Sequence, residues 1–416
     1  MFFPAAQFRM EGKKRPVKLS VHPSRGLVDE KFTVLVQNVP PGFQLTVHAL
    51  HQCEDGHSWH AFGHYTADST GAVNVAEDLS LGGTYSGVEQ MGLLWSLRPV
   101  PGSKPGLRLR KMNVQTPMEV TVSVFRGHQT EGFEDQGPLV SVVVERWYMA
   151  PGVCRIPVTE GGLTATLFLP SASGLFPGIL DLWGGGGRLV EYRAALLASR
   201  GFASLALDYM TPKISLFLTG LLFQTAFRVL QQHPQVLSSR MAIVGLSLGS
   251  SVAFQLMIYS QVIKVRQLDI NSGNTCFNEK NELICRDLVL PIPTDPKLKA
   301  DVGQLRCPLL LVVGEDDQNW AVSESAVDMK QMMEQAGNSH LLTVLSYPNA
   351  GHLIEPPYSP HTRSSNFRSS VDNSFVTLWG GETVEHSRAQ EDAWRKILTF
   401  FRENLYGRGS ALVSNL

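Results

Sequence analysis

The sequence predicts a two-domain protein in which an all-β sandwich precedes an α/β domain with a doubly wound, mostly parallel sheet. Short strands with alternating apolar and polar residues fill the first third of the chain, and beyond residue 150 buried strands alternate with helices. A chain of 416 residues is long enough for two such domains. We expect the sandwich over residues 16–148, the α/β domain over 155–407 and a C-terminal tail over 408–416.

The clearest strand of the first domain is MEVTVSVF, residues 118–125, in which apolar and polar side chains alternate. This period of two is typical of a strand with one buried face. Residues 32–39, 45–50 and 139–147 show similar patterns, and turn-forming clusters rich in Pro, Gly, Asn and Asp lie between the runs. Several short strands at such spacing predict a β-sandwich.

The second domain contains FPGILDLWGGGG, residues 176–187, a buried strand that runs into a glycine loop. A helix over residues 189–200 is expected to end at Gly201, and another buried strand follows at 202–209. The alternation continues to a final helix, residues 389–405. Its apolar face consists of Trp394, Ile397, Leu398, Phe401 and Leu405. Continuous apolar strands between helices predict a sheet that is covered on both faces.

Charge and hydropathy argue against two classes of protein. The 36 Lys and Arg residues are balanced by 37 Asp and Glu residues, so the chain lacks the basic surplus of a nucleic-acid-binding protein. The longest apolar stretch, residues 214–227, is too short and too interrupted to span a bilayer, and we expect a buried helix or the wall of an apolar pocket. Five cysteines without CxxC spacing favour a reducing compartment.

A serine lies between two glycines where a predicted strand is followed by a predicted helix, in Gly245-Leu246-Ser247-Leu248-Gly249. This is the G-x-S-x-G pattern of a nucleophile elbow, in the strand–turn–helix context that the motif requires. Side chains at the flanking positions would collide with the neighbouring strand and helix, and glycine avoids both collisions. The alternative is a small-residue turn that serves only close packing. We predict that Ser247 is a nucleophile at the positive end of the following helix.

An acid and a histidine follow Ser247 in the order expected for such a site. The strand within residues 307–314 ends just before Asp316 and Asp317, so a carboxylate lies at the carboxyl edge of the sheet. His352 lies in a later, turn-rich loop. We predict that His352 takes the proton of Ser247 and that Asp317, or its rival Asp316, orients the imidazole.

The same site needs hydrogen-bond donors for a developing oxyanion. The backbone N–H of Leu248 can supply one, and the glycine loop can supply the second from Gly184, Gly185 or Gly186. A flexible turn is the alternative for these glycines, and a P-loop is disfavoured because no Gly-Lys-Ser/Thr follows. Arg188, directly after the loop, faces either an anionic group of a substrate or solvent.

Residues 51–64 bring together His51, Cys53, His57, His60 and His64. Zinc is the functional alternative for this cluster. However, successive side chains of a strand point to opposite faces, and the spacing matches no zinc motif. We therefore predict no metal site.

Long strings of this sequence resemble the family of acyl-CoA thioesterases and bile acid-CoA:amino acid N-acyltransferases. Within residues 18–405 these strings are GLVDE (26–30), LGGTYSGVEQMGLLWSL (81–97), RWYMAPGV (146–153), GLFPGILDLWGGGG (174–187), EYRAALLASRGFASLAL (191–207), GHLIEPPYSP (351–360) and WGGE (379–382). The resemblance implies an N-terminal immunoglobulin-like sandwich joined to an α/β-hydrolase domain. It also implies a Ser or Cys nucleophile, an Asp and a His, which fall on Ser247, Asp317 and His352 and favour Asp317 over Asp316. Arg188 departs from the small residue expected there.

The resemblance further implies an acyl-CoA substrate and no separate cofactor, because coenzyme A enters with the substrate and leaves as a product. Water as the acyl acceptor gives a fatty acid, whereas taurine or glycine gives an amide. We place hydrolysis first, because an oxygen ester on serine is less reactive to amines than a cysteine thioester. N-acyl transfer to taurine or glycine is the alternative. Two alternative functions from other classes are a catalytically silent interaction protein and a serine peptidase.

The last three residues, Ser414-Asn415-Leu416, resemble a peroxisomal SKL-type address that lacks the central cation. We therefore expect a cytoplasmic or peroxisomal protein, with the peroxisomal import receptor as a partner in the second case. A mitochondrial presequence is less favoured, because Glu11 and two prolines interrupt the basic residues near the N-terminus.

Overall fold

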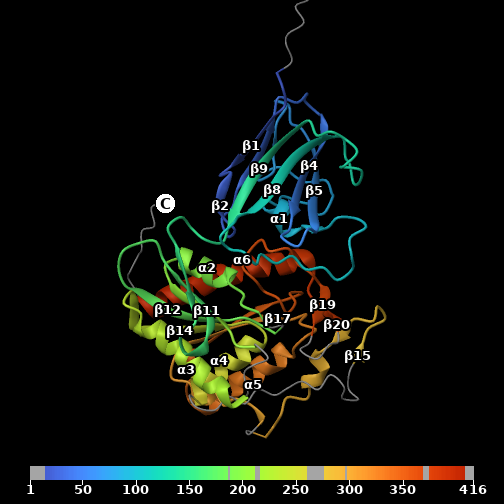
Figure 1. Ribbon diagram of the computed structural model, residues 1–416. Helices are drawn as coiled ribbons and strands as arrows, with labels where there is room; N and C mark the ends of the chain where they lie inside the picture. Colours follow the sequence, from blue (N-terminus) through green and yellow to red (C-terminus); the bar gives the residue numbers. More distant parts are fainter. Residues whose placement is uncertain are drawn as a thin grey trace, which may run out of the picture.

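The computed structural model describes residues 15–185, 188–210, 216–259, 276–295, 298–368 and 374–407. An elongated N-terminal β-domain stands on a larger α/β domain, as Figure 1 shows. Within the described residues, no helix is both long enough and apolar enough to cross a membrane. The five cysteines are all described, and all are free thiols.

The N-terminal domain consists of two sheets. The smaller sheet is antiparallel and contains β1 (Lys18–His22), β3 (Thr33–Gln37) and β6 (Val73–Asn74). The larger sheet has the order β2 (Arg25–Leu27), β9 (Val140–Trp147), β8 (Met118–Arg126), β4 (Gln44–Gln52), β5 (Ser58–Thr66) and β7 (Arg98–Pro99). Its pairs are antiparallel except for the parallel β2–β9 pair. The four strands predicted from alternation are confirmed as β3, β4, β8 and β9.

Inward-facing side chains from both sheets form a single apolar core, which is the physical reason for the alternation in the sequence. Val34 and Val36 of β3 belong to the same buried cluster as Val47 of β4 and Val122 of β8. A short helix, α1 (Gly92–Trp95), adds its own apolar side chains to this cluster. The two sheets therefore pack face to face.

The sheets of the second domain are parallel at the centre and antiparallel at one edge. The largest has the order β10 (Cys154–Val158), β11 (Thr164–Leu169), β13 (Ala203–Asp208), β12 (Phe176–Leu182) and β14 (Val236–Gly245). The pairs β12–β13 and β12–β14 are parallel, whereas β10–β11 and β11–β13 are antiparallel. A parallel pair is formed by β17 (Leu309–Gly314) and β18 (Leu342–Tyr347). A small sheet contains β15 (Cys276–Phe277), β16 (Leu283–Ile284), β20 (Ser374–Leu378) and β19 (Ser364–Arg368).

Helices cover both sides of these sheets, as predicted for continuously apolar strands. The main helices are α2 (Tyr192–Ser199), α3 (Leu216–Gln232), α4 (Leu248–Tyr259), α5 (Val322–Gln335) and α6 (Thr383–Phe401). In Figure 1, α2 and α6 lie on the side of the N-terminal domain, and α3, α4 and α5 lie on the opposite side. Single 3-10 turns span Glu160–Gly162, Arg286–Val289, Val302–Gln304 and Ser339–Leu341, and a π-helical turn, Arg402–Tyr406, ends the described chain.

Two predictions about helices have clear outcomes. Of the apolar stretch 214–227, residues 216–227 lie in α3 and residues 214 and 215 lie outside the described residues. Phe223 and Ala226 are buried against the sheet, and Phe223 and Phe227 also line the large cavity, so the helix is both partly buried and part of a pocket wall. The final helix begins at Thr383, earlier than the predicted residue 389. Its first turns are polar and give no apolar pattern, although His386 is fully buried there.

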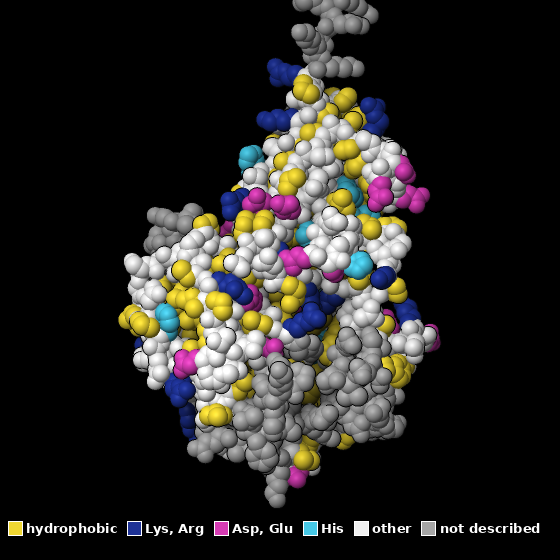
Figure 2. Space-filling view, viewed as in Figure 1, with side chains coloured by type: hydrophobic (Ala, Val, Ile, Leu, Met, Phe, Trp, Pro, Cys, Tyr) yellow, Lys and Arg dark blue, Asp and Glu magenta, His cyan; other side chains and the backbone are white. Residues whose placement is uncertain are grey.

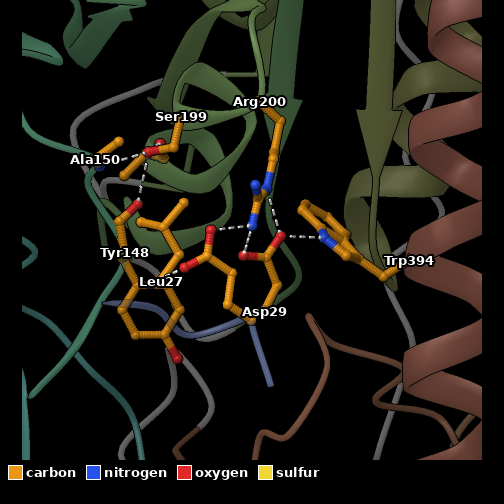
Figure 3. A network of polar contacts seen from close by, with 9 residues as sticks. Leu27, Asp29, Tyr148, Ala150, Ser199, Arg200 and Trp394 are labelled. Carbon is orange, nitrogen blue, oxygen red and sulfur yellow. Dashed lines mark hydrogen bonds and ion pairs between the residues drawn. The ribbon is translucent and has the colours of Figure 1, made fainter. Parts of the chain in front are cut away.

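Asp29, just after β2, joins the N-terminal domain to two helices of the α/β domain. Its carboxylate accepts hydrogen bonds from Arg200 Nε at 2.8 Å and from Trp394 Nε1 at 2.9 Å. Figure 3 shows these three side chains meeting between the end of α2 and the middle of α6. The Asp29 side chain is only 3% exposed, so water cannot replace these partners. This buried ion pair therefore holds the two domains in one fixed orientation.

We predict that Asp29→Asn destabilises the protein by about 3 kcal/mol, because it removes one charge of a buried pair and leaves the Arg200 guanidinium without its counter-charge. Urea unfolding measures this loss. Glu334→Gln is the matched control, because Glu334 forms an exposed ion pair with Lys330 and its loss should cost less than about 0.5 kcal/mol. Equal stability of the Asp29→Asn and wild-type proteins would contradict the role of this contact.

Candidate active site

Ser247 lies at the turn between β14, which ends at Gly245, and α4, which begins at Leu248. Its φ of 56° is in the left-handed region, which a non-glycine residue rarely adopts. This conformation costs about 1–2 kcal/mol, so the surrounding contacts must hold it in place. A strained residue at a strand-to-helix turn is the backbone geometry of a nucleophile elbow.

The two flanking glycines are required by close backbone contacts. A Cβ at position 245 would lie 2.5 Å from the carbonyl carbon of Gly249. A Cβ at position 249 would overlap the carbonyl oxygens of Leu182 and Trp183, at the end of β12. Because any side chain at either position would force the turn open, the sequence pattern Gly-x-Ser-x-Gly follows from packing.

Asp317 and His352 form a buried pair near the ends of β17 and β18. The Nδ1 atom of His352 lies 2.7 Å from Oδ2 of Asp317, and both side chains are less than 5% exposed. The second oxygen of Asp317 accepts hydrogen bonds from the backbone N–H groups of Asn319 and Trp320, each at 2.8 Å. These bonds hold the carboxylate facing the imidazole, so Nδ1 carries a proton and Nε2 is left as the basic atom.

Asp316 has different partners. Its carboxylate accepts hydrogen bonds from Arg363 at 2.9 Å, from Gln318 at 2.7 Å and from the backbone N–H of Gly381 at 2.8 Å. These contacts lower the pKa of Asp316 against the opposing effect of burial. Of the two rival acids, the structure brings Asp317 to His352 and uses Asp316 to bind the loop that precedes α6.

The Nε2 atom of His352 is buried and forms no hydrogen bond with the residues that the structure describes. The ring stacks on Trp379, with a centroid distance of 5.8 Å and an interplanar angle of 16°. Ser247, Asp317 and His352 line one common cavity. An unpaired basic nitrogen in the cavity that also contains the half-buried Ser247 can accept a proton from its hydroxyl or from a substrate.

The glycine loop after β12 approaches Ser247 from the neighbouring strand. A Cβ at Gly184 would lie 3.0 Å from Ser247 Cβ and 3.6 Å from Ser247 Oγ, so the loop backbone is in contact with the serine. Gly185 lines the same cavity, and Leu248 provides the first N–H group of α4. Gly186 lies outside the described residues. Arg188 is described, and its side chain is exposed.

Two features near the site were not among the residues predicted from the sequence. His386 of α6 contacts the backbone on both sides of His352, and Arg108 of the N-terminal domain pairs with Glu355, three residues after His352. Glu355 stands within the GHLIEPPYSP string, which was the available hint. His386 lies in a polar stretch whose burial no local pattern revealed.

The histidines of residues 51–64 contact separate protein groups. Among the described residues, no group of three or more His, Cys, Asp or Glu side chains could hold a metal ion. Three of these histidines are buried and have protein partners: His51 with the carbonyl of Glu119, His60 with His48 and His64 with the hydroxyl of Thr46. They serve the packing between β4, β5 and β8.

Comparisons with known proteins identify the family. Residues 29–160 match the model of the "Acyl-CoA thioester hydrolase/BAAT N-terminal region", and residues 221–292 and 265–407 match that of the "BAAT / Acyl-CoA thioester hydrolase C terminal" region. A peroxisomal succinyl-coenzyme A thioesterase of Mus musculus is 37% identical over 418 residues, which cover 93% of this chain and 96% of that protein. The chain belongs to the acyl-CoA thioester hydrolase/BAAT family.

Other relatives show the range of this family. The bile acid-CoA:amino acid N-acyltransferase of Homo sapiens is 34% identical over 94% of this chain and 98% of its own length. The mitochondrial acyl-coenzyme A thioesterase 2 of Mus musculus is 36% identical over 93% of this chain and 89% of its own length. Among solved structures, an acylaminoacyl peptidase is 13% identical with a TM-score of 0.41, covering 92% of this chain and 60% of that one. That structural likeness is too weak to bear on the reaction.

A fluorophosphonate, which reacts with activated serines, should label Ser247. We expect no labelling of Ser247→Ala, and at least about 100-fold slower labelling of His352→Ala, because the general base is lost. Intact-protein mass spectrometry over time measures the rate. Ser250→Ala is the matched control, since Ser250 lies within α4, and it should label as fast as wild type. Rapid labelling of the Ser247→Ala variant would contradict this assignment of the nucleophile.

Acid should destabilise the N-terminal domain through His48 and His60. Burial lowers the pKa of each imidazole from 6.5 to about 4, with a further effect of His60 on His48 and of Arg98 on His60. The unfolded chain therefore binds protons at higher pH than the folded protein does. The stability is complete above pH 6.5 and is lost as the pH falls towards 4, by at most about 1.4 kcal/mol per group per pH unit.

Urea unfolding between pH 7 and pH 5 measures this slope. His60→Gln should flatten it, because one depressed pKa is removed. His340→Gln changes an exposed histidine and should leave the slope as it is in wild type. Identical slopes in the two variants would show that the buried pair does not cause the acid sensitivity.

Proposed function

We propose that this protein hydrolyses acyl-CoA thioesters to free fatty acid and coenzyme A through an acyl-enzyme on Ser247. The observation that carries the proposal is the serine held at positive φ on the β14–α4 turn, in one cavity with the Asp317–His352 pair. Membership of the family supports the same reaction, since relatives of 35–37% identity are named acyl-CoA thioesterases.

In the first step, His352 accepts the proton of the Ser247 hydroxyl at Nε2 while Oγ forms a bond to the thioester carbonyl carbon. The carbonyl π electrons move to the oxygen, which becomes an oxyanion. The backbone N–H groups of Leu248 and of Gly184 or Gly185 would stabilise that charge. The Asp317 carboxylate stabilises the imidazolium through its contact with Nδ1.

Collapse of this intermediate breaks the carbon–sulfur bond. The coenzyme A thiolate takes the proton from His352 and leaves as a thiol, so that the acyl group remains on Ser247 as an oxygen ester. Water then attacks the ester and gives a proton to His352. The second collapse returns that proton to the Ser247 oxygen and releases the fatty acid.

N-acylation of taurine or glycine is the second candidate, because the human relative of 34% identity is named a bile acid-CoA:amino acid N-acyltransferase. An amine would then replace water in the second half of the reaction. The nucleophile in this chain is a serine, and an oxygen ester reacts less readily with amines than a thioester does. This difference places hydrolysis first.

The deciding experiment is a panel of acyl-CoAs of different acyl groups, each with and without taurine or glycine. Free thiol and acyl products are followed together, the latter by mass spectrometry. Thiol with free acid alone supports hydrolysis, and acyl amide formed at the expense of acid supports N-acyl transfer. A purified, folded protein that releases no thiol from any acyl-CoA would overturn both and favour a catalytically silent protein.

The two neighbouring aspartates provide an internal test of the mechanism. Asp317→Asn should lower kcat by about 10³–10⁴-fold, because an amide cannot hold His352 in the required tautomer. Asp316→Asn removes a carboxylate that contacts Arg363 instead, so its kcat should stay within about tenfold of wild type. Steady-state thiol release measures both variants. A larger loss in Asp316→Asn than in Asp317→Asn would reverse the assignment.

Several narrower predictions accompany this proposal. The immunoglobulin-like topology of the two N-terminal sheets, the domain limits 16–148 and 155–407, and the need for no separate cofactor stay predictions. The compartment is not set by the family, whose mouse members include peroxisomal and mitochondrial thioesterases. The tail 408–416, with its Ser-Asn-Leu ending, lies outside the described residues. A fluorescent protein that carries residues 408–416 at its own C-terminus would test the predicted import receptor, because such an address should direct the fusion to peroxisomes.

A further inference from the structure

A loop of the N-terminal domain extends along the active-site side of the α/β domain. It joins β7 to β8, and its backbone carbonyls at Pro105 and Gly106 accept hydrogen bonds from Asn366 at 3.0 and 2.9 Å. The same loop carries Arg108 and Arg110. These contacts fix two arginines of one domain against the other.

Arg108 is neutralised where it lies. It forms a buried ion pair with Glu355, and their side chains are 9% and 7% exposed. The Tyr192 hydroxyl donates a second hydrogen bond to the same carboxylate oxygen at 2.8 Å. The Glu355 carboxylate is therefore already bound by Arg108 and Tyr192. Among the described residues, it is also the only carboxylate whose charge raises the pKa of the neighbouring Arg110.

Arg110 and Arg188 lack such a counter-charge. Burial, followed by the charge of Arg108, lowers the pKa of Arg110, and Arg188 acts on it in the same direction. Neither Arg110 nor Arg188 has a hydrogen bond or an ion pair with any residue that the structure describes. Glu355 is thus paired with Arg108, and Arg110 and Arg188 carry positive charges without an ion-pair partner among the described residues.

Part of this positive charge lies on the wall of the cavity that contains the reacting groups. Arg108 and Arg110 line the same cavity as Ser247 and His352, and Arg188 follows the glycine loop that touches Ser247. Figure 2 shows Lys and Arg side chains where the two domains meet. An anion bound at Arg110 would therefore share the cavity with a substrate on Ser247 without occupying the catalytic centre.

We propose that Arg110 and Arg188 bind phosphate groups of the acyl-CoA substrate at the domain boundary. The inference rests on the proposed function and names the part of the substrate that this surface recognises. Guanidinium groups bind phosphate oxygens in pairs of charge-assisted hydrogen bonds. The uncharged pantetheine arm separates the phosphates from the thioester, so a phosphate site belongs in the same cavity as the nucleophile but at a distance from it, and the domain boundary with Arg110 offers such a place.

The test compares two substrates that share an acyl group. One is the acyl-CoA, and the other is the acyl thioester of N-acetylcysteamine, which has no phosphate. Arg110→Ala and Arg188→Ala should each raise the KM for acyl-CoA about tenfold, equivalent to about 1.4 kcal/mol, with kcat within twofold. The KM for the N-acetylcysteamine thioester should not change. Arg126→Ala, which removes an exposed arginine from the end of β8, is the matched control.

Two further measurements separate the possible failures. Binding of desulfo-coenzyme A, measured by calorimetry, reports on the phosphate site even if the protein hydrolyses no thioester. A succinyl thioester of N-acetylcysteamine places the anion on the acyl side instead. If Arg110→Ala or Arg188→Ala raised the KM only for the succinyl thioester, the phosphate site would be overturned. An equal rise in KM for the acyl-CoA and for its N-acetylcysteamine counterpart would overturn it as well. Desulfo-coenzyme A binding that depends on Arg110 would support it, whatever the outcome for hydrolysis.

A second inference concerns His386 and comes from separate contacts. Its Nδ1 atom accepts a hydrogen bond from the backbone N–H of Gly351 at 3.0 Å, and its Nε2 atom contacts the carbonyl of Leu353 at 2.8 Å. The ring is fully buried and stacks on His361 with a centroid distance of 4.0 Å. Burial lowers the pKa of His386 to about 3, so the ring is neutral and can accept at one nitrogen while it donates at the other.

We infer that His386 is a positioning residue for His352. The two backbone groups that it binds flank His352 in the chain, so together they set the direction in which that imidazole leaves the backbone. A single hydrogen bond would let the loop pivot, whereas one on each side prevents rotation. His386 itself does not line the cavity and need not touch the substrate.

Three substitutions at this position separate positioning from packing. His386→Asn can keep the acceptor for Gly351, His386→Gln can keep the donor for Leu353, and His386→Phe keeps neither. We expect fluorophosphonate labelling of Ser247 to slow least in His386→Asn, more in His386→Gln and most, by up to about 100-fold, in His386→Phe. The KM for acyl-CoA should stay within twofold of wild type in all three variants. Thermal unfolding establishes which variants are folded. Folded Asn and Gln variants that both label at the wild-type rate would overturn the inference.

Discussion

The close approach of α4 to the end of β12 is the contact on which the candidate site depends. Gly249 lies so near the Leu182 and Trp183 carbonyls that no side chain fits between them, and the chain must bend sharply to reach this position. The bend leaves Ser247 at positive φ. The parallel register of β12 and β14, which pairs Leu182 with Gly245, brings the glycine loop to the same edge of the sheet. One packing contact therefore sets both the hydroxyl and the backbone that faces it.

Buried ion pairs explain why the N-terminal domain is fixed next to the candidate site. Asp29 and Glu355 are buried carboxylates at the domain boundary, and each is paired with an arginine from the other domain. Separation of the domains would leave these charges without partners in an apolar surrounding, which is costly. The β-domain is thus held as a fixed wall beside the catalytic groups, and its loop supplies positive charge there.

The sequence was sufficient for those features that depend on local rules. Alternation identified β3, β4, β8 and β9 because one face of each strand supplies apolar side chains to the shared core, although Thr46 and His48 on the other face of β4 are buried as well. The elbow was recognisable because its glycines answer a steric requirement within five residues. Asp316 and Asp317, by contrast, are adjacent carboxylates at the end of one strand, and no local rule distinguishes them. The resemblance to a family favoured Asp317, and the fold shows the reason: Arg363 and Gly381, distant in the chain, bind Asp316.

The sequence by itself determined the two-domain order, the β- and α/β character of the parts and the residues able to form a nucleophile, an acid and a base. These follow from periodicity and from the sterics of neighbouring residues. Only the tertiary structure decided which carboxylate meets His352, that α6 begins with buried polar turns, and that Arg108 and His386 act near the site. Each of these depends on contacts between segments far apart in the chain. A buried polar side chain needs a hydrogen-bond partner, and the fold, not the local sequence, determines which group is near enough to supply it.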